Sequence, residues 1–371
     1  MRSALLVFCY AVAVAWVLPW PLRRLSEPGA SPRLGLAAWL TAMVSVLALA
    51  VAALGLLGRA AVAGWPAFAR TVCESVSAGT CSPAVYRSAA YELGLAAVAF
   101  LGGLTMIILG WRYGRSLRRA SVRTRAHAEA ARITGRPVEG RNAAFVLDAA
   151  RPAVYCVPGR PPTIVLTTGA LEVLDPEQLT AVLAHERAHL AGRHHLLLAV
   201  TRSLAAIAPA VPVFARGTGE VARLAEMRAD DVAARSAGGE QGRRTLLAAL
   251  LAMGAGVAGA QRLSAGPPAA WLAATGGVVA ARVRRLAAPP APARWVGHGL
   301  ALAGLTVAIA ATSALVLAFA VAGISLPDPP PMRVGCELAS KPVKSKDGGT
   351  GPPYSGSPCT RPRSSTLSGR S

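Results

Sequence analysis

A short stretch rich in histidine is the part of this sequence best suited to chemistry. Residues 183–195, "LAHERAHLAGRHH", contain four of the six histidines in the chain. His185 and His189 are four residues apart, which on a helix places both rings on one face about one turn apart. Two imidazoles placed in this way can bind one tetrahedral zinc ion. The spacing therefore predicts a zinc site on a helix.

Glu186 supplies the carboxylate that hydrolytic chemistry at such a site requires. It directly follows His185, which turns its side chain toward the open side of the metal. From there it can take a proton from the attacking water, whose pKa zinc lowers to about 7. His185, Glu186 and His189 together form the HExxH pattern of zinc peptidases. We expect Glu186 to be the general base.

Two residues compete for the place of third metal ligand. His195 completes the pattern HExxHxxGxxH, in which Gly192 turns the chain. Glu226 lies on a second predicted amphipathic helix, four residues before Asp230, so it can bind the metal while Asp230 orients a ligating histidine. The HExxHxxGxxH pattern is typical of soluble, secreted enzymes, whereas the apolar segments of this chain, described below, indicate a membrane protein. This difference favours Glu226 as the third ligand. We expect His194 and His195 to lie at a polar helix end instead.

Local signals place the HExxH motif on a capped helix that follows a short sheet. Asp175 is a good N-cap, Pro176 suits the first helical position, and Gly192 suits the C-terminal end. The preceding strand candidates are residues 143–149, 153–157 and 163–171.

The composition indicates a membrane protein. Apolar residues make up 53% of the 371 residues and charged residues only 15%. Three apolar runs, residues 34–58, 93–111 and 299–324, are long enough to span a bilayer. Residues 4–20 form a shorter run that we interpret as a first membrane helix rather than a signal peptide, because no small-x-small cleavage site follows its apolar core.

The basic residues predict the orientation of the chain. The net charge is +21, yet no zinc-finger spacing or RNA-binding signature accompanies it, so we expect no nucleic-acid partner. The densest basic segments, residues 112–125 and 282–294, flank apolar runs, and the positive-inside rule then places residues 112–296 in the cytoplasm. The loop at 59–90 and the tail from residue 325 would lie outside, and the tail has the composition of a disordered segment.

Four cysteines fall in the two segments predicted to lie outside. They are Cys73 and Cys81 in the loop and Cys336 and Cys359 in the tail. Disulfides form in such oxidising surroundings, although unpaired thiols remain the alternative.

Residues 196–214 are apolar enough to suggest a fifth span. If they crossed the bilayer once, Glu226 would lie on the opposite side from His185 and His189, and no shared site could form. We therefore expect a buried or interfacial helix.

Two segments carry a family resemblance. "TIVLTTGALEVLDPEQLTAVLAHERAHL" followed by "EMRADDVAAR" resembles the membrane metallopeptidases of families M48 and M56, the latter including BlaR1-like antibiotic-sensor proteases. The resemblance implies that His185, His189 and Glu226 bind zinc and that Asp230 supports them. M48 enzymes often carry a His-Pro before their last arginine-containing helix. This chain has "GGVVAARVRRL" there, which favours M56 or leaves oxyanion stabilisation to an Arg or a Tyr.

The same resemblance suggests where a substrate binds. In such peptidases an edge strand near the metal pairs with the extended substrate backbone. By position the candidates are Thr163, Ile164, Val165, Leu166 and Thr167. A sheet-interior strand that does not touch substrate is the alternative.

The sequence thus predicts an α+β protein: a polytopic α-helical membrane protein of about four spans with a gluzincin-type peptidase domain between the last two. The expected parts are 1–111 with three spans, the peptidase domain 112–296, a fourth span 297–324 and the tail 325–371. The expected function is a membrane zinc metalloendopeptidase with one Zn²⁺ per chain, acting on a peptide or protein such as a cytoplasmic repressor. The alternative is a signal transducer whose zinc domain binds a partner without cleaving it.

Overall fold

The computed structural model describes residues 2–78, 83–138, 144–159, 161–263, 270–289 and 291–322. Cys81, Cys336, Cys359 and the predicted disordered tail lie outside these residues, so the expectations about them remain predictions. The helices are α1 (Arg2–Trp16), α2 (Pro19–Ser26), α3 (Pro32–Ser77), α4 (Pro83–Thr134), α5 (Thr168–Val173), α6 (Pro176–Ala191), α7 (His194–Ile207), α8 (Pro212–Ser236), α9 (Glu240–Leu263), α10 (Ala270–Ala287) and α11 (Pro292–Ala322). The strands are β1 (Arg136–Pro137), β2 (Ala144–Leu147), β3 (Val154–Val157) and β4 (Thr163–Thr167).

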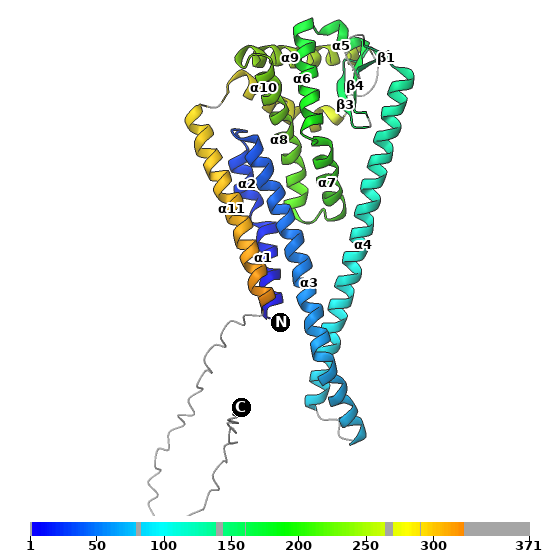
Figure 1. Ribbon diagram of the computed structural model, residues 1–371, viewed down its shortest axis with the longest axis vertical. Coiled ribbons are helices and arrows are strands. Elements are labelled where there is room, and N and C mark those ends of the chain that lie inside the picture. The colour runs from blue at the N-terminus through cyan, green and yellow to red at the C-terminus, as the bar shows by residue number, and fades with distance from the viewer. Residues whose placement is uncertain are drawn as a thin grey trace, which may run out of the picture. The chain divides into compact units, whose positions relative to one another are not determined.

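Four helical segments among the described residues are long and apolar enough to cross a membrane. They are Arg2–Ser26, Pro32–Ser77, Val85–Thr134 and Ala293–Ala322. Each coincides with one of the four predicted apolar runs, and α3 and α4 continue as helix well beyond them (Figure 1). Large apolar side chains such as Val51, Ile107 and Val307 are more than 60% exposed along these helices. A lipid environment accounts for apolar exposure on this scale.

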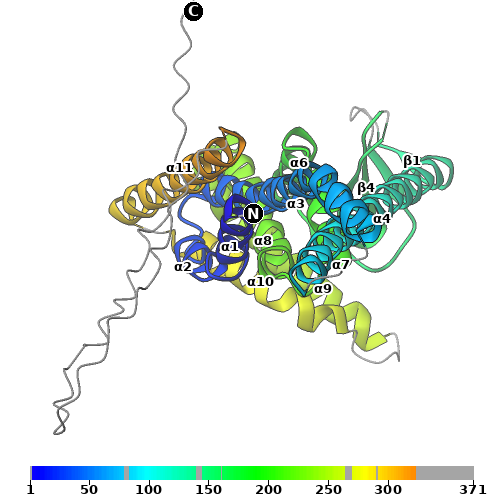
Figure 2. The same ribbon diagram turned by 90° about the horizontal axis from the view of Figure 1, so that it is seen from below.

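Helix α8 joins the peptidase segment to the predicted membrane helices. Val221 and Leu224 of α8 are fully buried in one core with Trp39 and Met43 of α3. A Cβ at Gly217 would lie 2.3 Å from Met43 Cε and 2.8 Å from a ring carbon of Trp39, so only glycine permits this approach of α8 to α3. Figure 2 shows α8 beside α1 and α3. The two predicted parts of the chain therefore share a hydrophobic core.

Helices α7 and α8 form a hairpin that resolves the question of a fifth span. Helix α7 is apolar but has only 14 residues, about 21 Å of helix, and it is not among the candidate spans. The chain turns after Ile207, and α8 then packs against both α7 and α6 (Figure 1). Because the hairpin returns, Glu226 on α8 lies at the same level as the motif on α6.

The small sheet contains both parallel and antiparallel pairs, in the order β1-β2-β4-β3. Strand β4 pairs with β2 on one side and with β3 on the other, and all five of its residues are buried. The expectation that Thr163–Thr167 pairs with substrate is therefore wrong, because both of its edges already carry a protein strand. The edge strand is β3, which packs against α6.

Candidate active site

Helix α6 holds the HExxH motif where the sequence places it. The Asp175 carboxylate accepts hydrogen bonds from the backbone N–H groups of Glu177 and Gln178, and the Gln178 side chain returns a bond to the cap residue. This capping box fixes the start of the helix. His185 and Glu186 are only 5% and 9% exposed. Their burial needs polar partners, since an unpaired buried polar group is costly.

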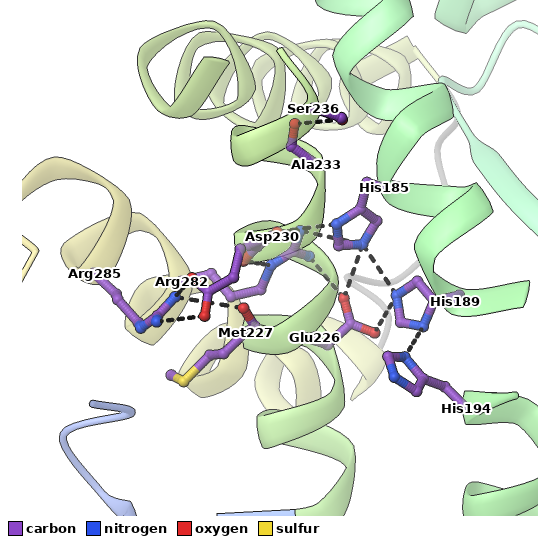
Figure 3. Close-up of polar contacts among 11 residues, drawn as sticks. His185, His189, His194, Glu226, Met227, Asp230, Ala233, Ser236, Arg282 and Arg285 are labelled. Atoms are coloured by element: carbon purple, nitrogen blue, oxygen red, sulfur yellow. Dashed lines mark hydrogen bonds and ion pairs between the residues drawn. The ribbon is translucent and has the colours of Figure 1, made fainter. Parts of the chain in front are cut away.

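The carboxylate partners of His185 come from α8. Nε2 of His185 lies 3.1 Å from Nε2 of His189, and Glu226 places its two carboxylate oxygens 3.4 and 3.5 Å from these nitrogens (Figure 3). In a tetrahedral zinc site with bonds of 2.0–2.1 Å, neighbouring ligand atoms are about 3.3 Å apart. The three residues therefore match the spacing of zinc ligands, and together they form a group that can hold a metal ion.

Asp230 supports the first histidine from behind. Its Oδ1 lies 3.0 Å from Nδ1 of His185, the ring nitrogen that faces away from the other ligands. A carboxylate at this position fixes the orientation of a ligating histidine and raises its basicity. The structure thus brings together the four residues His185, His189, Glu226 and Asp230, as the spacing predicts.

Arg282 of α10 completes the cluster, and it is the residue that sequence reasoning missed. Its Nε and Nη2 donate to the two oxygens of Asp230 at 2.9 and 2.7 Å, and its Nη1 lies 3.0 Å from Glu226 Oε2. The only sequence signal was the "ARVRRL" segment, in which several arginines look alike. From the sequence, an Arg is one candidate for stabilising the oxyanion. In the structure, Arg282 instead binds the carboxylates of Asp230 and Glu226.

The cluster favours positive charge at His185. Burial would lower the pKa of His185, yet its contacts with Asp230 and Glu226 outweigh burial and raise it to about 9. Burial would likewise raise the pKa of Glu226, but His185, His189 and Arg282 hold it well below its ordinary value. The carboxylates therefore stay ionised, and they would stabilise a bound metal cation in the same way.

His194 is the second unexpected member of the site. It lies at the start of α7 rather than at the polar end of α6, it is only 2% exposed, and its Nδ1 is 3.0 Å from Nδ1 of His189. Gly192 makes room for it: a Cβ there would lie 2.5 Å from Nε2 of His194. Any residue can adopt the φ of −76° found at Gly192, so the backbone conformation does not require a glycine there. The glycine of the HExxHxxGxxH pattern is instead required by the close approach of the His194 ring.

The charge state of His194 decides how it supports His189. Burial first, and then electrostatic repulsion from His189 and from Arg228, lower the pKa of His194 to about 4. A neutral ring at pH 7 has one unprotonated nitrogen that can accept a hydrogen bond from His189 Nδ1–H. His194 thus holds one ligating ring, and Asp230 holds the other.

We expect this contact to make the protein sensitive to acid. The folded-state pKa of His194 lies below the unfolded value of about 6.5, so the unfolded state binds more protons between pH 6.5 and 4. The stability present above pH 6.5 is therefore lost as the pH falls toward 4. Thermal melting between pH 7.5 and 5 should show a steeper loss for the wild type than for His194→Gln. Parallel curves for the two proteins would contradict the assignment.

Glu186 is held against the edge strand β3. The backbone N–H of Cys156 donates to Glu186 Oε2 at 2.9 Å. Burial, the negative charge of Glu186 and a hydrogen bond to it raise the pKa of the Cys156 thiol to about 12, so the thiol is neutral. Glu186, Tyr155 and Cys156 line one cavity of about 430 Å³ with the metal-binding group. This volume is in the range of ligand-binding clefts.

His195 lines the same cavity but, within the described residues, does not belong to the metal-binding group. The arrangement therefore favours Glu226 over His195 as the third ligand. The two adjacent histidines therefore have different positions. His194 lies beneath the metal-binding group, and His195 lies in the wall of the cavity.

Comparison with known proteins supports the same chemistry. Residues 116–217 match the model of peptidase family M48, a segment that includes His185, Glu186 and His189 and ends before Glu226. The chain matches no curated protein and no solved structure. The assignment to M56, which the missing His-Pro favoured, is not confirmed. The match supports peptidase family M48, and with it a metallopeptidase, for the part of the chain that carries the HExxH helix.

Proposed function

We propose that this protein is a membrane zinc metalloendopeptidase. The observation that carries the proposal is the convergence of His185 and His189 from α6 with Glu226 from α8, at the spacing of zinc ligands. The match to peptidase family M48 supports the reaction class, and the four apolar helices support a membrane location.

The residues of the chain divide the catalytic work among them. Zinc, when bound, would act as a Lewis acid on the scissile carbonyl and lower the pKa of water. Glu186, beside the ligands and held by Cys156 N–H, would take the proton from the attacking water and deliver it to the leaving amine. Asp230 and His194 would keep the ligating rings in position. Arg282 would keep both carboxylates ionised.

The substrate backbone would lie along β3. The N–H of Cys156 points away from β4 toward Glu186, and in an antiparallel pair residues two apart face the same way. The N–H and C=O groups of Val154 and the C=O of Cys156 therefore face the open edge of the sheet, beside the Cys156 N–H that binds Glu186. An extended peptide added there would pass directly over the cavity that Glu186 lines.

The setting suggests a regulatory role. We propose a multi-pass protein whose peptidase part lies in the cytoplasm, on the basis of the basic flanks at 112–125 and 282–294. The layout of four spans with the domain before the last resembles M56 and suggests a cytoplasmic repressor as one substrate. A non-cleaving transducer is the alternative, and only a test of catalysis separates the two.

Zinc content tests the ligand assignment. Purified wild-type protein should carry one zinc ion per chain, and Glu226→Ala should lose it. The loss in affinity should exceed the 10–100-fold typical of losing an outer-shell partner, because a direct ligand is removed. His195→Ala is the matched control and should retain the metal. Loss of zinc in the His195 variant alone would overturn the ligand set.

A further inference from the structure

A second pocket lies on the other side of α8 from the metal-binding group. Successive residues of a helix are rotated by about 100°, so Arg228, two positions after Glu226, faces away from it. Arg228 and Arg235 of α8 line a pocket of about 340 Å³ together with Arg33 of α3 and Trp295 of α11. Helices α3 and α8 thus bring three arginines to one pocket, and α11 adds a tryptophan.

Within the described part of the chain, the positive charge of this arginine pocket is only partly offset. None of the ion pairs formed there includes Arg33, Arg228 or Arg235. The one acidic residue in the lining, Asp231, accepts from both terminal nitrogens of Arg285, at 2.6 and 2.9 Å. Figure 3 shows Arg285 on the side of α8 away from His185.

The electrostatics of Arg228 agree with this geometry. Burial lowers the pKa of its guanidinium first, and the positive charges of Arg33 and Arg235 lower it further, against a smaller opposing effect of Asp231. The three side chains therefore repel one another. An anion placed between them would relieve this repulsion.

The pocket lies where two candidate membrane spans begin. Arg33 is the second residue of α3, and Trp295 is in the first turn of α11. Tryptophan and arginine at the ends of membrane helices lie at the level of the lipid headgroups. Ser31, the residue before α3, also lines the pocket and leaves the first backbone N–H groups of that helix without a side-chain cap. These groups add to the positive potential.

We propose that the arginine pocket binds the phosphate group of an anionic phospholipid headgroup. Guanidinium groups pair with phosphate through two parallel hydrogen bonds, and three unpaired arginines can surround one phosphate. Basic pockets between membrane helices are known to take such headgroups. This inference rests on the proposed membrane location: with the candidate spans α3 and α11 in a bilayer, a lipid would reach the pocket by lateral diffusion.

Lipid retention by the full-length protein tests the proposal. We would exchange the purified protein between micelles containing phosphatidylglycerol or phosphatidylcholine with the same acyl chains, and count bound lipids by native mass spectrometry. The wild type should retain phosphatidylglycerol in preference. Arg33→Gln and Arg228→Gln should each reduce that preference about fivefold, which corresponds to about 1 kcal/mol for each arginine near the surface.

Arg216→Gln is the matched control. Arg216 is an exposed arginine on the same helix and lies outside the pocket, so its loss should leave the preference unchanged. Equal retention in Arg228→Gln and Arg216→Gln would overturn the proposal, as would the absence of any preference in the wild type. Glycerol 3-phosphate should compete with the lipid if the phosphate is what the arginines bind. Binding of glycerol 3-phosphate without retention of phosphatidylglycerol would overturn the lipid as the source. Zinc content and melting temperature report whether each variant is folded.

Discussion

Glu186→Gln should abolish proteolysis while leaving the metal in place. The amide keeps the shape of the side chain and can still accept from the Cys156 N–H, which lies 2.9 Å from Glu186 Oε2. It cannot take a proton from water, and loss of a positioned general base lowers rates by about 10²–10⁴-fold. Cleavage of a peptide library, or self-cleavage of the purified chain, would be compared with zinc content in the same preparations.

The variant also separates the two candidate functions. Glu186 is not in the metal-binding group, so zinc content should match the wild type. Lost cleavage with retained zinc is the result that a peptidase predicts. Proteolysis that continues unchanged in Glu186→Gln would exclude the catalytic assignment. If wild type and variant are both inactive toward every peptide yet bind the same partner, the zinc domain is a binding module.

Arg282→Met should produce the largest loss of stability among single changes in the site. Its guanidinium is only 12% exposed and binds Asp230 at 2.7 Å and Glu226 at 3.0 Å. Removing it leaves a fully buried carboxylate without its cation, which typically costs about 3–5 kcal/mol. The midpoint of unfolding in detergent should fall, and zinc affinity should fall with it, because Asp230 and Glu226 lose their common support.

Neighbouring arginines provide the controls for that experiment. Arg284 lies on the same helix and is exposed. The substitution Arg284→Met removes the same charge as Arg282→Met. Its variant should unfold like the wild type. Arg282→Lys keeps the charge but not the fork that binds both carboxylates, so partial recovery is expected. An Arg282→Met protein as stable as Arg284→Met would show that the buried ion pairs contribute nothing.

Much of the site follows from local sequence rules. The four-residue spacing of His185 and His189 places both rings on one face in any helix, and Asp175 and Pro176 fix where that helix starts. Apolar runs of sufficient length mark the spans whatever packs around them. Glu226 and Asp230 followed from the same four-residue spacing, with the family resemblance to guide the choice. These features depend on neighbours in the chain, so the sequence alone suffices.

The remaining features depend on contacts between distant segments, which no local pattern encodes. Strands β3 and β4 both have strand-like sequences, and only the pairing of β4 with β2 and β3 on its two sides made β3 the edge. His194 and His195 are adjacent in sequence, yet the turn at Gly192 buries one ring against His189 and leaves the other in the cavity wall. Arg282 became part of the site because α10 packs on α8.

The sequence by itself determined two ligands, a base and a membrane setting, because helical periodicity and hydropathy act over one or two turns. The tertiary structure alone decided which partners hold those residues: Arg282 and His194 behind the ligands, and β3 beside Glu186. It also brought together the three arginines of the separate pocket. The physical reason is that a buried charge or ring is stabilised by whatever group reaches it in space, and that group can lie far away in the chain, as Arg282 lies 97 positions from His185.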